Sequence, residues 1–291
     1  MGMNLLKAPF RLAIRVFENV ERKHLSVVAA GLTYYFLMSL FPALAVLAAV
    51  VAYLPWQGGM RDVTAFLSNL MPPQAMSLFT QFMNSIRVHR TGLLSFGIIA
   101  TLWLSSKAVK GIIAGLDIVY QVPAPRRLWT NRILAFGLTF AVGVLLLLGV
   151  ALTLVGPAVE AMLERTASVQ SLWVRAWPYV QWIPAAIFIF AAIELLYLLA
   201  PNLPARQRVT VPGALIAAAG WLTLSWGLGL YFHYFGGTGL SRFYEFLAAP
   251  IAVMIWLYWS AFALLIGAEI NASLQSKTSA EAEAFEPRKA A

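Results

Sequence analysis

The chain has 291 residues, of which 60% are hydrophobic and only 11% are charged. Soluble domains contain about 45–50% apolar and about 25% charged residues, so this composition excludes an ordinary soluble fold. Lysine and arginine outnumber aspartate and glutamate by 21 to 12. Cysteine is absent, which excludes disulfides, thiolate metal sites and a cysteine nucleophile.

Residues 1–24 form a basic segment before the first apolar run. One helical face of this segment is apolar, with basic residues beside it, and the positions are Leu6, Phe10, Ala13, Ile14 and Phe17 with Lys7, Arg11 and Arg15. This pattern predicts an amphipathic N-terminal helix lying on the inner leaflet. A solvated basic helix explains the pattern equally well.

Six apolar runs within residues 25–275 are each long enough to cross a bilayer, which takes roughly 20 apolar residues. They are Leu25–Tyr53, Leu93–Tyr120, Ile133–Val155, Val180–Leu199, Val211–Phe235 and Phe246–Ile270. We therefore expect an all-α polytopic membrane protein with six transmembrane helices. With the N-terminus inside, loop lysines and arginines are roughly twice as frequent on the inner side, as the positive-inside rule requires. Both termini are then cytoplasmic.

The remaining segments are expected to lie outside the spans. In the first outer loop, apolar residues recur at helical spacing on both sides of Pro72 and Pro73, which predicts two amphipathic helices at about residues 60–90. An outer loop is expected from Pro157 to Tyr179. Residues 276–291 are polar and rich in alanine and glutamate, so we expect a disordered cytoplasmic tail.

The first two spans contain residues that could shape or move the helices. Pro42 removes a backbone hydrogen bond and predicts a bend after Phe41, with Tyr34 and Ser39 one to two turns before it. Gly111 and Gly115 would permit close approach of a neighbouring helix. We assign these five positions, Pro42, Tyr34, Ser39, Gly111 and Gly115, a structural or gating role.

Ionisable residues inside the spans are costly and usually face a partner or water. Lys107, Lys110 and Asp117 fall within roughly 80° of one another on the second span. The functional interpretation is that the lysines line a hydrated cavity and bind an anionic group such as a phosphate, with Asp117 beside them. The alternative is a structural ion pair with Glu194 or Glu269, with Lys110 reaching inward to water.

Two glutamates in later spans are candidate partners. Glu194 lies deep in the fourth span and is expected to pair with Lys107 or Lys110, which would place it at the binding site. Glu269 lies near the cytoplasmic end of the sixth span. A bridge from Glu269 to Arg126 or Arg132 is the favoured interpretation, and a gating role is the other.

The sequence contains few residues or motifs that could support catalysis. The three histidines, His24, His89 and His233, lie far apart and have no clustered carboxylates. No P-loop, dinucleotide fingerprint or nucleophile elbow is present. We expect a protein that is not an enzyme and holds no metal or cofactor. The spread of basic residues also argues against nucleic acid as a partner and favours anionic lipid headgroups.

Four stretches resemble the YihY/BrkB family of bacterial inner-membrane proteins. They are Ala29–Pro42 (AAGLTYYFLMSLFP), Leu104–Lys107 followed by Gly115–Asp117, Val211–Ala214 (VPGA), and Ile255–Ala272 with its GAEIN segment. The similarity spans about Val20 to Leu274, although an amide is expected where Asp117 stands. It implies six helices in the inner membrane and a role in the cell envelope linked to movement of lipid or lipopolysaccharide precursors. The family was once labelled ribonuclease BN, but the residues offer neither a metal cluster nor a basic catalytic face.

The sequence therefore predicts a translocator or exporter of an anionic lipid or similar amphiphile. The alternative is a noncatalytic membrane scaffold that recruits envelope proteins through the long outer loop or the basic inner loops. Ribonuclease activity is not expected.

Overall fold

The computed structural model describes residues 7–53, 91–122, 126–163, 182–203, 209–235 and 242–285. For residues 40–53, 91–102, 153–163 and 277–285, among others, it describes the helical backbone only. The described residues form helices and no strand, which confirms the all-α prediction. The helices are α1 (Lys7–Arg22), α2 (Leu25–Tyr53), α5 (Thr91–Val119), α6 (Leu128–Leu163), α8 (Trp182–Leu199), α9 (Val211–Phe235) and α10 (Arg242–Phe285).

Three of these helices contain stretches long and apolar enough to cross a membrane, among the residues described: Leu128–Gly149, Val211–Tyr231 and Pro250–Ser276. Two shorter apolar stretches, Leu25–Ser39 and Ile183–Leu199, lie in α2 and α8. The presence of membrane-spanning helices is thus supported, while the number six stays a prediction. The helices expected near residues 60–90 lie outside the described residues.

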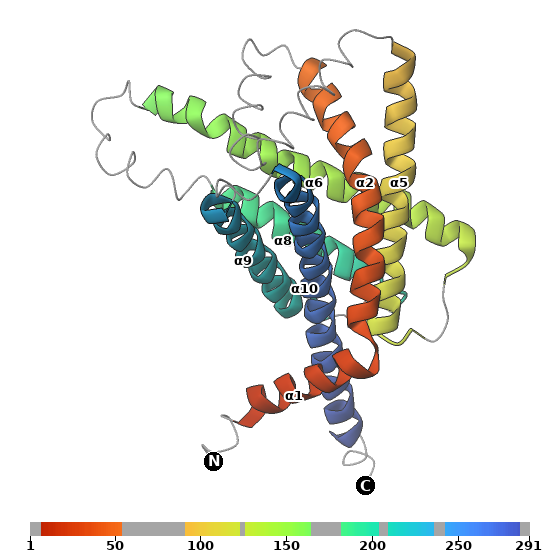
Figure 1. The fold of residues 1–291 in the computed structure, drawn as a ribbon. Helices are drawn as coiled ribbons and strands as arrows, with labels where there is room; N and C mark the ends of the chain where they lie inside the picture. The colour runs from red at the N-terminus through yellow and green to blue at the C-terminus, as the bar shows by residue number, and fades with distance from the viewer. Residues whose placement is uncertain are drawn as a thin grey trace.

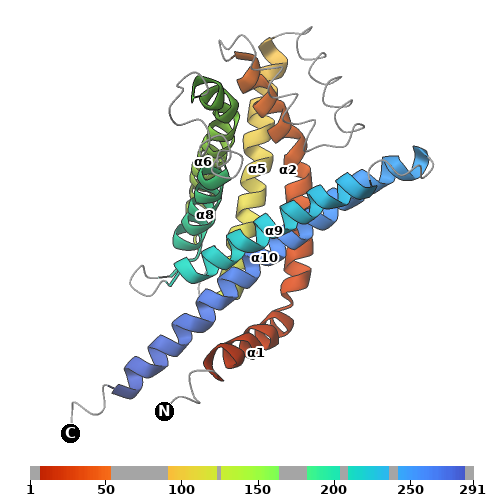
Figure 2. The same cartoon turned by 90° about the vertical axis from the view of Figure 1, so that its left-hand side faces the viewer.

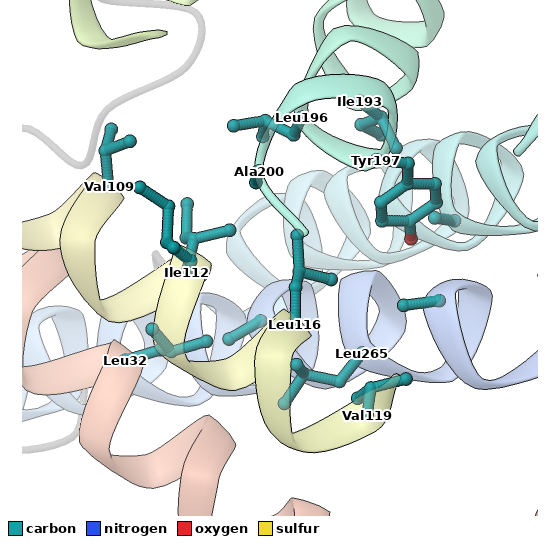
Figure 3. Close-up of a cluster of buried hydrophobic side chains, with 14 of the residues drawn as sticks. Leu32, Val109, Ile112, Leu116, Val119, Ile193, Leu196, Tyr197, Ala200 and Leu265 are labelled. Carbon is teal, nitrogen blue, oxygen red and sulfur yellow. The ribbon is translucent and has the colours of Figure 1, made fainter. Parts of the chain in front are cut away.

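The helices pack mainly as three pairs, α2 with α5, α6 with α8, and α9 with α10 (Figure 1). α6 crosses α5 at a steep angle near the middle of α5 instead of running beside it. α1 and the C-terminal end of α10 lie at the same end of the molecule in both views (Figure 2). The shared core between the pairs includes Leu32, Leu116, Leu265 and Tyr197 (Figure 3).

Two turns of the backbone with positive φ set the ends of helices α1 and α5. His24 has a φ of 50° and separates α1 from α2, while Gln121 has a φ of 52° just after α5. The Val122 N–H donates to the Asp117 carbonyl at 3.0 Å, a left-handed cap of the kind that ends many helices. The first corner turns α1 away from the axis of α2 and lays it across α10.

Two helices are longer than the sequence predicted. α6 continues through Pro157 to Leu163, where an outer loop was expected, because Ala158–Leu163 contains good helix formers. α10 continues to Phe285, through part of the tail that we expected to be disordered. Alanine and glutamate have high helix propensity, and this local preference outweighs the polar composition.

Candidate functional site

Lys107 and Lys110 lie on an exposed face of α5. Together with Trp103 and Ile118 they occupy an arc of roughly 80°, and all four side chains are exposed. The opposite face, which includes Ile113 and Leu116, is buried in the core. Within the described part of the chain, neither lysine makes an ion pair or a side-chain hydrogen bond.

Asp117 lies near the end of the same helix and is half-buried. Its Oδ1 accepts a long hydrogen bond, 3.4 Å, from the backbone N–H of Asn202 after α8. Asp117 forms no ion pair with either lysine among the described residues. Its role here is to join the ends of two helices, and it does not neutralise the lysine face.

Arg132 of α6 lies against α5 at the point where the two helices cross. Its guanidinium carbon is 4.0 Å from the centroid of the Trp103 ring and 5.6 Å from that of Phe136. Its Nη2 atom is buried and has no hydrogen-bond partner among the described residues. From the sequence, Arg132 was expected only as a partner for Glu269, because the helix crossing that brings it beside Trp103 has no signal in the sequence.

Glu269 of α10 is fully buried, and its partner differs from the predicted one. Lys23 donates to Glu269 Oε2 at 2.6 Å, and Asn19 and Ser273 donate to Oε1 at 2.7 and 3.3 Å. Lys23 also donates to the carbonyl of Val119 at the end of α5, at 2.6 Å. The predicted bridge to Arg126 or Arg132 is therefore wrong. Glu269 instead ties the α1–α2 corner and α5 to α10.

Arg126 is occupied at the end of α8. It donates to the carbonyls of Leu199, Ala200 and Pro201 at 3.2, 2.6 and 3.1 Å. A cation at a helix C-terminus satisfies the last carbonyls and opposes the negative end of the helix dipole. This role explains why Arg126 does not reach Glu269.

Glu194 of α8 also has a different partner from the one expected. Its Oε1 accepts a short hydrogen bond from the hydroxyl of Thr210, the residue that precedes α9. Its Oε2 is buried without a donor among the described residues. The predicted pair between Glu194 and Lys107 or Lys110 is not formed, because the lysines face outward from α5 while Glu194 faces the start of α9.

α9 and α10 approach each other closely where the start of α9 meets Gly267 and Asn271 of α10. Asn271 of α10 accepts from the Gly213 N–H at 2.7 Å and donates to the Thr210 carbonyl at 2.8 Å, and so caps the start of α9. A Cβ on Gly213 would lie 2.0 Å from the Gly267 carbonyl oxygen. A Cβ on Gly267 would lie 2.4 Å from the Gly213 carbonyl oxygen. Both glycines belong to the stretches on which the family resemblance rests.

The predicted gating positions are spread along α2 and α5. Tyr34 is 59% exposed and meets Tyr35 edge to face, and the Ser39 hydroxyl donates to the Phe36 carbonyl at 2.9 Å. Pro42 lies within α2, with its side chain outside the described residues. The two α5 glycines pack on α2, Gly111 against Leu32 and Tyr35, and Gly115 against Val28 and also Leu265 of α10. This is the close approach expected of the pair, while gating stays a prediction.

Among the described residues, no group of three or more histidine, aspartate and glutamate side chains could hold a metal ion. His233 lies in α9 with its side chain outside the described residues.

Comparison with known families decides the class of the protein. Residues 16–291 match the family model described as virulence factor BrkB. The chain belongs to the BrkB family. The BrkB assignment agrees with the resemblance seen in the sequence.

Relatives of this BrkB-family chain include membrane proteins. A Bacillus subtilis protein named ribonuclease-like protein YfkH is 31% identical over 250 residues, 86% of this chain and 90% of the relative. A UPF0761 membrane protein of Tolumonas auensis is 26% identical over 268 residues, 91% of this chain and 85% of the relative. No solved structure matches the chain. The protein is a membrane protein of the BrkB family.

Proposed function

We propose that this BrkB-family protein moves an anionic lipid or a similar amphiphile across the bacterial inner membrane during envelope biogenesis. In this proposal six helices span the membrane, both termini are cytoplasmic, and Lys107 and Lys110 bind the headgroup. The observation that carries the proposal is the exposed, unpaired state of these two lysines on α5, among the residues that the structure describes.

A charged lysine is expensive inside a membrane unless it meets water, a counter-ion or the interface. Lys107 lies near the middle of α5, so it is about 24 Å from the start of the helix and about 18 Å from its end. At that depth an unpaired ammonium group favours a hydrated path or a bound anion. An anionic amphiphile would supply the bound anion, since its headgroup would meet the lysines while its tails stay in lipid.

The test is lipid flipping in proteoliposomes that carry fluorescent anionic and zwitterionic lipids. Wild-type protein should flip the anionic lipid selectively. Lys107→Glu and Lys107→Ala should slow flipping at least roughly tenfold, because a hydrogen bond to a charged group is worth about 1.5–3 kcal/mol. Arg127→Ala is the matched control. Arg127 is exposed and lies outside the helices, and its substitution by alanine removes one positive charge, as Lys107→Ala does.

Two results would contradict the proposal. Normal flipping by both Lys107 variants would remove the lysines from the pathway. No selective flipping by folded wild-type protein would favour a scaffold, and a stoichiometric envelope partner that is lost when Thr64–Ile86 is deleted would then identify the alternative function.

A further inference from the structure

We propose that Arg132, held on the Trp103 ring, forms with Lys107 a binding site for the phosphate group of an amphiphile. The inference rests on the proposed function, since it names the headgroup chemistry for the same lysine face. It adds a residue on α6 and a preference among anions.

The first support is the way Arg132 is held. Its guanidinium carbon lies 4.0 Å from the Trp103 ring centroid, and the Phe136 ring lies on the same helix as Arg132 at 5.6 Å. Contact with a ring occupies the face of a guanidinium and fixes its plane, while the N–H groups point outward in that plane. The guanidinium of Arg132 is therefore held in one plane before any ligand arrives.

The second support is that this guanidinium lacks an anionic partner. In the described part of the chain, the single ion pair joins Lys23 to Glu269, and Nη2 of Arg132 has no hydrogen-bond acceptor. Arg132 lies four residues after the start of α6, next to the apolar run of that helix, where a charge without a partner is costly. An incoming anion would remove that cost.

The third support is the position of the lysines relative to Trp103. Lys107 follows Trp103 by one helical turn, so their Cβ atoms are roughly 5–6 Å apart. Lys110 lies on the same exposed face. Asp117 lies ten residues beyond Lys107, about 15 Å along the axis, and is engaged by Asn202. The crossing of α5 and α6 (Figure 1) thus brings Arg132 of α6 onto the Trp103 ring, one helical turn from Lys107 on the same exposed face of α5.

These cations match a phosphate better than a carboxylate. A phosphate monoester carries about −1.5 to −2 charge and three acceptor oxygens, so it can bind the guanidinium fork and a lysine at once. A carboxylate has one charge and two oxygens, which the arginine alone would satisfy. The site should therefore prefer a phosphomonoester headgroup.

The test is binding to the purified full chain in detergent, measured by native mass spectrometry. The probes are short-chain phosphatidic acid and a fatty acid of equal chain length. Wild-type protein should bind phosphatidic acid at least roughly tenfold more tightly than the fatty acid. Arg132→Gln should weaken phosphatidic acid binding roughly 10- to 100-fold, as expected when a charge-assisted pair is lost.

Two further variants and one control variant keep the test decisive. Arg132→Lys keeps the charge but loses the planar fork, so it should lose much of the preference for phosphate. Trp103→Leu should weaken phosphate binding by releasing the guanidinium, while Arg127→Gln should change nothing. Because these variants act separately, a folding defect in one leaves the others informative.

The outcomes distinguish this inference from the proposed function. Equal binding of both probes, or unchanged binding by Arg132→Gln, would overturn the phosphate site even if anionic lipids are flipped. Selective phosphatidic acid binding that depends on Arg132, with no flipping by wild-type protein, would support the site and overturn the transport function.

Discussion

The Nζ of Lys23 lies 2.6 Å from Oε2 of Glu269, and the pair joins two parts of the chain that are 246 residues apart. The side chain of Lys23 is 9% exposed and that of Glu269 is 0% exposed. Lys23 also reaches the last carbonyl of α5, at Val119. One buried cation therefore holds the α1–α2 corner, the end of α5 and the C-terminal half of α10 together.

Breaking this pair should destabilise the protein strongly. Removing one member of a buried ion pair typically costs about 3–5 kcal/mol because the other charge is left unpaired. Glu269→Gln and Lys23→Ala should each lower the free energy of unfolding by that order, measured by denaturation in mixed micelles. The double variant Lys23→Ala with Glu269→Gln should lose less stability than the sum of the two single changes.

Arg22→Ala is the control for this prediction. Arg22 is exposed, and its described side-chain bond, 2.8 Å to Asn19, stays within the same helix. It should change stability by no more than about 0.5 kcal/mol. Wild-type stability in Glu269→Gln, with transport lost, would instead support the gating role.

A second prediction follows from the close contact between α9 and α10. Gly213→Ala would place a Cβ 2.0 Å from the Gly267 carbonyl oxygen, so two backbones would have to separate. The cost should reach about 3 kcal/mol or more. In contrast, Gly227→Ala meets nothing within 4 Å and should stabilise α9 by about 0.5–1 kcal/mol. The same unfolding assay compares them, and equal effects would contradict the close contact.

Helix positions were largely predictable from the sequence. α9 has the predicted bounds, Val211–Phe235, because an apolar run lies between a Thr–Val–Pro start and the glycines that follow Phe235. The extents of α6 and α10 were underestimated, since hydropathy marks the membrane-spanning part of a helix and not its end. Helix propensity beyond the apolar run decided those ends.

Partner choice was not predictable in the same way. The sequence identified Glu269 and Glu194 as unusual, but gave each the wrong partner, because several cations lay at similar predicted depth. The true partners, Lys23 and Thr210, lie at a helix corner and a helix start. Their positions depend on the turn at His24 and on the glycine contact between α9 and α10.

Asn271 provides a third prediction, since it caps α9 from another helix. Asn271→Ala should leave the Gly213 N–H without its acceptor in a buried place, at a cost of about 1–3 kcal/mol. Asn271→Asp keeps the acceptor for the Gly213 N–H. It replaces the amide group that donates to the Thr210 carbonyl by a carboxylate oxygen, which cannot donate. Both variants should be less stable than wild type, and amide hydrogen exchange should increase first at the start of α9. Unchanged exchange there would contradict the cap.

The apolar side of α1 gives the last prediction. Phe10 and Phe17 are 69% and 67% exposed, while the basic side chains Arg11 and Arg15 lie beside them, also exposed. Val20 and the Lys23–Glu269 pair fix the opposite side of this segment on the core. An apolar stripe next to a basic stripe fits an anionic lipid surface, and α1 runs directly into the apolar helix α2.

Because the chain has no cysteine, a single introduced thiol labels one position only. A fluorophore on Phe17→Cys should be quenched by brominated lipids in anionic proteoliposomes, while one on Arg15→Cys should be quenched much less. Zwitterionic lipids should weaken the quenching at position 17, since the adjacent basic residues then lose their counter-charges. Equal quenching at both positions would contradict this prediction, because a helix embedded on one side distinguishes its two faces; weak quenching at both would mean that α1 lies in water.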